Sequence, residues 1–293
     1  MFYLEKVISI IGNVTCRESV AILGEILQKQ GLAFVDVSES VFALNCAGSV
    51  ENLMKQEELL KSAVLFVTDD ASCVKLLRQE GWPVLAILHE DNRAQDLSGA
   101  LYACEEPQEL DADYMDRVFR RYMRIPWDVL QTERCFIRET VPEDVPFFYK
   151  IYSAPSVTQY TEGLYPEIEQ EKKYINDYID NVYSFYNFGV WTIIKDDTDE
   201  IIGRAGFSYR EGYEEPEIGF VIGVPWQRQG YAEEVCRAVL KYGYEELGFT
   251  EVQALVKPDN QASVALCRKL GFELKQEVPV NGERLLRFMK KPD

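Results

Sequence analysis

A strand-like run that passes through a glycine-containing turn into a helical pattern limits the folds open to this 293-residue chain. The run EIGFVIG covers residues 217–223, and the helical pattern AEEVCRAVLKYGYEEL begins at Ala232. The turn between them therefore presents the start of a helix, where several N–H groups lack partners within the helix. Together with the helix dipole, these groups favour an anion, and Gly230 lets the main chain approach it closely. The junction predicts a pyrophosphate site.

The same turn resembles the acyl-CoA signature of the GCN5-related N-acetyltransferase (GNAT) superfamily, Q/R-x-x-G-x-G/A. Gln227, Gly230 and Ala232 meet that signature here. From Arg134 to Lys290 the order of the expected elements is similar to that fold, and EIGF, PDNQAS and LCRKLGF resemble the RimJ/RimL-like branch. The resemblance implies a mixed sheet flanked by helices and acetyl-CoA as co-substrate. It also implies direct attack of a primary amine on the thioester in a ternary complex.

The resemblance further implies which residues contact acetyl-CoA. The end of the strand would pair with the pantetheine arm as an added strand does, and the turn would surround the pyrophosphate. Asn260 would hold the arm from the other side, although it is equally suited to cap a helix at 261–270, and both roles can coexist. The implied contacts are Ile222, Gly223, Val224, Arg228, Gln229, Gly230, Tyr231, Ala232, Glu233, Asn260 and Ser263.

Two residues are candidates for acid–base catalysis. Glu217 resembles the position where many relatives place a general base, and the alternative is an ordinary surface carboxylate. A main-chain N–H near Val221 or Ile222 would hold the thioester carbonyl. Where many relatives have a tyrosine near the sulfur, this chain has Cys267. A thiol, with a pKa of about 8.5 against about 10 for tyrosine, can pass a proton. The alternatives are a core cysteine, with water or Ser263 as the acid.

The net charge of −18 disfavours nucleic acid or an anionic membrane as the main partner. It suits a cationic partner such as an amine, although a solvated acidic surface is an alternative explanation. We expect the amine to enter near Tyr209 and Tyr213, beside the acidic loop 211–217, unless these tyrosines serve only packing. A protein N-terminus, a polyamine and a small aminated metabolite all stay open as acceptors.

Histidine and cysteine usage excludes several kinds of chemistry. His89 is the only histidine, and it follows an apolar strand pattern into a polar loop, as a structural histidine would. A Ser-His-Asp triad and an H-E-x-x-H zinc site are therefore not expected, and we expect no metal. The seven cysteines are scattered without a C-x-x-C pair, and the N-terminal run is too short for a signal peptide or membrane span. These features predict a cytoplasmic protein with reduced thiols.

The first 125 residues alternate strand and helix patterns. Apolar runs at 7–12, 32–37, 63–68 and 83–88 are separated by helical patterns, including candidates at 50–61 and 111–124. This rhythm predicts a Rossmann-like parallel sheet covered by helices. The first turn, GNVTC from Gly12, matches neither G-x-G-x-x-G nor G-x-x-x-x-G-K-[ST].

The chain is long enough for two domains. We expect an accessory domain at 1–125, a linker at 126–133 and a GNAT domain at 134–293. The accessory domain would be regulatory or oligomerising, which leaves a homodimer open. The alternative function is a non-catalytic acyl-CoA sensor whose N-terminal domain is the output module.

Overall fold

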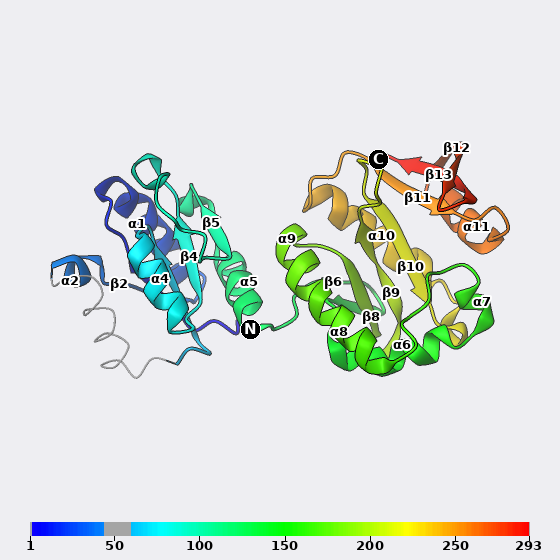
Figure 1. The fold of residues 1–293 in the computed structure, drawn as a ribbon, viewed down its shortest axis with the longest axis horizontal. Coiled ribbons are helices and arrows are strands. Elements are labelled where there is room, and N and C mark those ends of the chain that lie inside the picture. Colours follow the sequence, from blue (N-terminus) through cyan, green and yellow to red (C-terminus); the bar gives the residue numbers. More distant parts are fainter. Residues whose placement is uncertain (1, 44–59, 293) are drawn as a thin grey trace. The chain divides into compact units, whose positions relative to one another are not determined.

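The computed structural model of the protein describes residues 2–43 and 60–292. The chain divides into two compact units, Met1–Trp127 and Asp128–Asp293, and each is described by itself (Figure 1). The helix expected at 50–61 lies almost entirely outside the described residues.

The first unit contains a five-stranded parallel sheet in the order β2-β1-β3-β4-β5. Its strands are β1 (Lys6–Ile10), β2 (Ala33–Asp36), β3 (Val64–Thr68), β4 (Val84–Ile87) and β5 (Tyr102–Cys104). Its helices include α1 (Val14–Lys29), α2 (Ser38–Ala43), α4 (Ala71–Gln79) and α5 (Ala112–Met123). One core cluster joins α1 and α5 to the sheet and a second joins α4 to it, so helices cover both faces. The predicted parallel α/β architecture is confirmed, with the short strand β5 as an addition.

The second unit contains an eight-stranded sheet in the order β12-β13-β11-β10-β9-β8-β7-β6. Its strands are β6 (Asp128–Gln131), β7 (Cys135–Arg138), β8 (Val190–Lys195), β9 (Glu200–Ser208), β10 (Glu217–Ile222), β11 (Val252–Val256), β12 (Glu273–Val280) and β13 (Glu283–Lys290). The β10–β11 pair is parallel and the other pairs are antiparallel. The predicted mixed sheet is therefore confirmed.

The helices of the second unit are α6 (Val145–Tyr152), α7 (Pro155–Thr158), α8 (Ile168–Tyr178), α9 (Ser184–Tyr186), α10 (Tyr231–Glu245) and α11 (Gln261–Lys269). A π-helical turn at Ile179–Tyr183 connects α8 to α9. This turn places Tyr178 and Tyr183 side by side, with ring centroids 5.0 Å apart. The Tyr178 hydroxyl accepts the N–H of Val190 and the Tyr183 hydroxyl donates to its carbonyl, so both rings anchor the start of β8.

The linker expected at 126–133 needs correction, because residues 128–131 form the edge strand β6. Val129 and Leu130 pack against the core of the second unit, which gives this segment a reason to join the sheet. The hairpin to β7 is closed by the N–H of Thr132, which donates to the Cys135 carbonyl at 2.8 Å.

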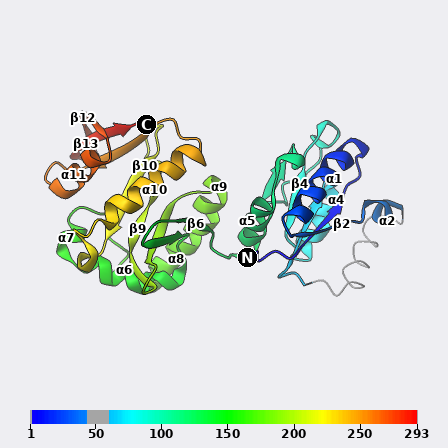
Figure 2. The same cartoon turned by 180° about the vertical axis from the view of Figure 1, so that it is seen from behind.

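Helices of the second unit cover opposite faces of its sheet (Figures 1 and 2). Val235 and Val239 of α10 belong to one core cluster with Ile218 and Ile222 of β10. Phe148 of α6 belongs to another cluster, against which Val221 packs. Because side chains alternate along a strand, Glu217, Gly219 and Val221 share the face covered by α6.

Candidate active site

The two parallel strands at the centre of the sheet separate after a single pair. Glu217 of β10 pairs with Gln253 of β11, and no further pair follows among the described residues. Each strand nevertheless stays bonded to its other neighbour to the end, since Ile222 pairs with Gly203 and Val256 with Leu286. The carboxyl ends of β10 and β11 therefore diverge and leave main-chain groups of β10 without a neighbouring strand.

The main chain of Ile222 faces this opening. The N–H of Gly223 donates to the Ile202 carbonyl on β9 at 2.8 Å. Because main-chain groups of successive residues point to opposite sides of a strand, the N–H and carbonyl of Ile222 point away from β9. The carbonyl of Ile222 accepts instead the side-chain amide of Gln227 at 2.8 Å. Gln227, the first residue of the sequence signature, thus fastens the turn to the end of the strand.

The turn after β10 is exposed and has an unusual backbone. Val224–Trp226 form a short 3-10 turn, and Arg228 (φ 59°) and Gly230 (φ 89°) both have left-handed conformations. Gly230 is the N-cap of α10 and makes no side-chain cap hydrogen bond to the helix. The first amides of α10 consequently remain available, and amides in such a turn form an anion-binding concavity. This is the geometry that the sequence predicts for a pyrophosphate, although contact of each predicted residue with a cofactor stays a prediction.

Arg134 supports this turn, and the sequence analysis did not identify it. Its guanidinium pairs with Glu234 at 2.6 Å, donates to the Gln229 carbonyl at 3.1 Å and lies 4.2 Å from the Tyr231 ring centroid. Burial alone would raise the pKa of Glu234, but hydrogen bonds from Thr132 and Arg134 outweigh it and lower the pKa. No local signal points to this contact, because Arg134 and Glu234 lie 100 residues apart in the chain.

Replacing Arg134 with methionine is expected to weaken acetyl-CoA binding by about 10-fold or more, the effect of losing one charge-assisted hydrogen bond. The turn would lose its contact at Gln229, and Glu234 would lose its counter-ion. Isothermal titration calorimetry with acetyl-CoA measures the effect. Arg284→Met, at a side chain that is 85% exposed, is the matched control. Wild-type affinity in Arg134→Met would contradict the supporting role.

The side chains of Glu233 and Asn260 interact with other groups of the protein. The carboxylate of Glu233 pairs with Lys269 and Arg237, which leaves its main-chain N–H as the group able to face an anion. Asn260 caps α11, since its Oδ1 accepts the N–H of Ser263 at 3.2 Å. The capping role is therefore present, and a contact of Asn260 or Ser263 with the cofactor stays a prediction.

Glu217 opens β10 and is 8% exposed. Its carboxylate pairs with the Arg210 guanidinium at 2.5 Å, a partner that the sequence analysis missed. Burial raises the pKa of Glu217, and the Arg210 contact offsets only part of that effect. A carboxyl group shifted toward neutral pH is suited to exchange protons, so the candidate base sits in a suitable environment.

Cys267 lies in the core cluster of the α10 face and is 3% exposed. Burial raises the pKa of its thiol to about 12. Such a thiol is a weaker acid than the tyrosine that it replaces. This setting favours the core-cysteine alternative, and the acid role stays a prediction.

Cys267→Ala discriminates between these two roles. If Cys267 only fills the core, kcat stays near wild type while the free energy of unfolding falls by about 1 kcal/mol. Steady-state rates and denaturant unfolding measure the two quantities. A loss of kcat by about tenfold or more, with folding intact, would instead establish the acid role.

The two tyrosines expected at the acceptor entrance have different packing partners. Tyr209 packs its ring against Tyr186 and Phe188, at centroid distances of 5.4 and 5.7 Å, and remains 45% exposed. Tyr213 lies under the Arg287 guanidinium at 4.9 Å. Both positions are accounted for by packing, and a contact with substrate stays a prediction for each.

In the first unit, the amides of the turn after β1, where this fold type commonly binds phosphate, are already bonded to a side chain of the protein. The carboxylate of Asp69 accepts the N–H groups of Gly12 and Asn13 at 2.7 and 2.8 Å. His89 Nε2 lies 3.4 Å from the same carboxylate. His89 thus lies just after the carboxyl end of β4. The Asp69 carboxylate already occupies the amides of the turn.

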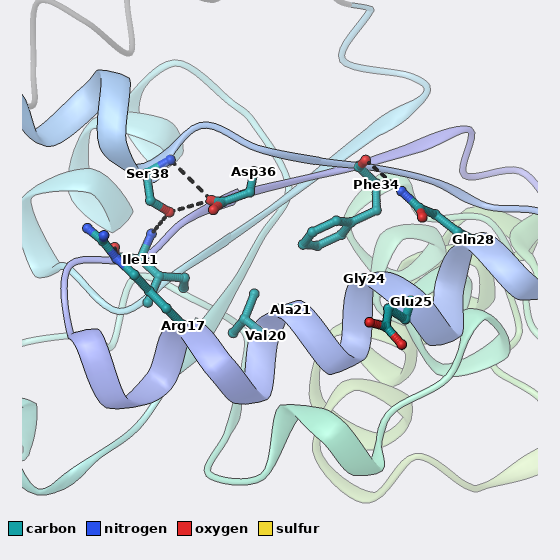
Figure 3. A pocket seen from close by; sticks show the side chains of 10 residues that line it. All are labelled: Ile11, Arg17, Val20, Ala21, Gly24, Glu25, Gln28, Phe34, Asp36 and Ser38. Carbon is teal, nitrogen blue, oxygen red and sulfur yellow. Dashed lines mark hydrogen bonds between the residues drawn. The ribbon is translucent and has the colours of Figure 1, made fainter.

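A separate cavity of about 270 Å³ lies between α1 and β2 (Figure 3). Arg17, Asp36 and Ser38 gather at one end, and Glu25 and Gln28 at the other. Asp36 already accepts hydrogen bonds from Ser38 and from Ser9. The cavity has polar groups of both signs, which identifies no single ligand class.

No helix in the described part of the chain has the length and apolarity to cross a membrane. Within residues 2–43 and 60–292, no group of three or more histidine, cysteine or acidic side chains is placed to hold a metal ion.

The fold and the site together define a mixed α/β domain of the acyltransferase class. The family model described as "Acetyltransferase (GNAT) domain" matches residues 134–273. The uncharacterized N-acetyltransferase YoaA of Bacillus subtilis (strain 168) is 33% identical over 161 residues, which cover 53% of this chain and 90% of YoaA. The uncharacterized N-acetyltransferase YnaD of the same organism is 32% identical over 145 residues, 49% of this chain and 81% of YnaD. A solved acetyltransferase from Agrobacterium tumefaciens str. C58 has 24% identity and a TM-score of 0.49, over 56% of this chain and 94% of that one.

The chain belongs to the GNAT acetyltransferase family. The resemblance stated from the sequence is confirmed at this level, and assignment to the RimJ/RimL-like branch stays a prediction.

Proposed function

We propose that this protein transfers the acetyl group of acetyl-CoA to a primary amine by direct attack in a ternary complex. One observation carries the proposal: β10 separates from β11 and leads directly into the uncapped start of α10 at Gly230. An opening between strands suits an extended pantetheine arm, and an adjoining group of free amides suits its diphosphate. Membership of the GNAT family supports the same donor.

The residues proposed to hold acetyl-CoA follow the path of this opening. The strand end at Ile222, Gly223 and Val224 would bond the pantetheine arm, and residues 228–233 would surround the diphosphate. Asn260 and Ser263 would contact the arm from the start of α11. The structure gives the turn the required exposure, because residues 227–230 are all exposed.

The chemistry requires one bond exchange. The amine nitrogen attacks the acetyl carbon, so that a C–N bond forms, the C–S bond breaks and CoA leaves as a thiolate. The proton lost by the amine passes to Glu217, directly or through water, and the thiolate takes a proton from water or from Cys267. The main-chain N–H near Val221 or Ile222 would stabilise the carbonyl oxygen as it becomes negative.

The acidic composition supports an amine acceptor and disfavours a nucleic-acid or membrane partner. The scattered cysteines support a cytoplasmic enzyme, and a homodimer is left open as part of the proposal. Tyr209 and Tyr213 are proposed at the rim of the acceptor entrance. The acceptor classes considered are a protein N-terminus, a polyamine and a small aminated metabolite.

Release of free CoA thiol from acetyl-CoA, measured across a panel of amines, tests the proposal. Turnover that depends on one amine class would support it. Tight acetyl-CoA binding by calorimetry without turnover on any amine would instead favour a non-catalytic acyl-CoA sensor, with the first unit as its output module. Absence of acetyl-CoA binding would contradict both.

A further inference from the structure

Arg204 on β9 is a buried cation that the proposed mechanism does not use. It is 9% exposed and is the one charged residue in the otherwise apolar run IIGRAGF. Its Nε has no hydrogen-bond partner. Within the part of the chain that the structure describes, no carboxylate forms an ion pair with its guanidinium. A buried charge without a counter-ion is costly, so this position calls for an explanation.

The neighbours of Arg204 compensate its charge only in part. The guanidinium lies 4.7 Å from the ring centroid of Phe148 and within electrostatic reach of the Tyr152 hydroxyl, and both residues are on α6. A ring face and a neutral hydroxyl stabilise a cation less than a carboxylate does. The buried acid Glu171 of α8 lies within electrostatic reach of Tyr152, but it accepts the N–H of Tyr165 at 3.0 Å and does not pair with Arg204.

The position of Arg204 relates it to the reacting groups. Arg204 is the direct cross-strand partner of Val221 on β10, so both side chains lie on the face covered by α6. Val221 precedes Ile222, whose main chain faces the opening between β10 and β11. Gly219 lies on the same face, and nothing occupies the space within 4 Å of where its side chain would begin. The face beside Arg204 therefore has open space at Gly219, close to the strand end proposed to hold the thioester.

We propose that Arg204 binds a carboxylate of the acceptor, which makes the acceptor a small amine with a carboxylate close to its reactive nitrogen, such as an amino acid. This inference rests on the acetyl transfer proposed above. A guanidinium and a carboxylate form paired, charge-assisted hydrogen bonds, and the ligand would supply the counter-ion that the protein lacks. A polyamine would meet a buried like charge, and a protein N-terminus would bring no carboxylate at this place. Arg204 takes no part in the bond exchange and acts on specificity alone.

The test compares each of the twenty amino acids with its amide as acceptor, by CoA thiol release from acetyl-CoA. A polyamine and a peptide with a free N-terminus complete the panel. For the preferred side chain, we expect kcat/KM for the amino acid to exceed that for the amide by about 10- to 100-fold, the effect of one charged hydrogen-bonded pair. Arg204→Gln should bring this ratio close to one, and Arg204→Lys should retain part of it.

Several outcomes would overturn the inference. These are equal kcat/KM for acid and amide in the wild type, a polyamine or peptide as the best acceptor, or an unchanged ratio in Arg204→Gln. Each of them still shows turnover, so the proposed acetyl transfer would stand, whereas no turnover with any amine would remove both. Arg284→Gln, at an 85% exposed arginine, is the matched control. If Arg204→Gln does not fold, as judged by circular dichroism, the wild-type ratio and Arg204→Lys decide the question.

Discussion

Replacing Gly230 with tryptophan is expected to raise the Kd for acetyl-CoA by roughly 100-fold or more, the combined effect of backbone strain and lost amide contacts. Gly230 has φ 89°, a conformation that side-chain-bearing residues rarely adopt. A side chain there would also begin 3.4 Å from the Arg134 guanidinium, over the amides that we assign to the diphosphate. Isothermal titration calorimetry with acetyl-CoA measures the loss.

Gly282→Trp is the matched control for this prediction. Gly282 lies in the turn between β12 and β13, has φ 83°, and has open space within 4 Å of the added side chain. Its replacement imposes similar strain without covering the start of α10, so acetyl-CoA binding should remain close to wild type. Undiminished binding in Gly230→Trp, with the variant folded, would show that the turn does not hold the donor.

The sequence predicts the local parts of the site but not the parts that depend on strand pairing. The turn at Gly230 was predictable because strand, turn and helix are adjacent in the chain and each leaves a local pattern. The separation of β10 from β11 was not, because it depends on the pairing of Glu217 with Gln253 across an intervening helix. Sequence patterns indicate that both strands exist, but not where their pairing stops.

Side-chain partners were the least predictable part of the site. Arg134 reaches Glu234 across 100 residues, and Arg210 reaches Glu217 only because the loop after β9 folds back. Tyr209 was expected near the acceptor, but its ring packs on Tyr186 and Phe188, which are distant from it in the chain and contact it only in the fold. A charged residue within an apolar strand is visible in the sequence. Arg204 could therefore have been identified as a further candidate site residue from the sequence alone.

Glu217→Gln is expected to lower kcat by about 100-fold or more, the range for loss of a general base. The amide cannot accept a proton from the attacking amine, but it still offers an oxygen to Arg210. Acetyl-CoA affinity should change little, because Glu217 lies at the opposite end of β10 from the turn at Gly230. Glu214→Gln, at an exposed acid in the same loop, is the control and should retain wild-type turnover. Equal rates for wild type and Glu217→Gln would exclude Glu217 as the base.

The pH dependence of these variants gives a second, independent readout. Burial raises the pKa of Glu217, and the base is active only when ionised, so kcat/KM should rise with pH through this raised pKa. This limb should be absent in Glu217→Gln. In Arg210→Gln it should move to higher pH, because the guanidinium is the group that lowers the pKa of Glu217.

The raised pKa of Glu217 also predicts how the free energy of unfolding changes with pH. A carboxyl with a raised pKa binds more protons folded than unfolded, so its contribution is fully present below the unfolded pKa of about 4.3 and is lost as pH rises through the folded value. The free energy of unfolding of the wild type should therefore fall relative to Glu217→Gln across that window. A constant difference between the two proteins across that window would instead show that folding does not raise the pKa of Glu217.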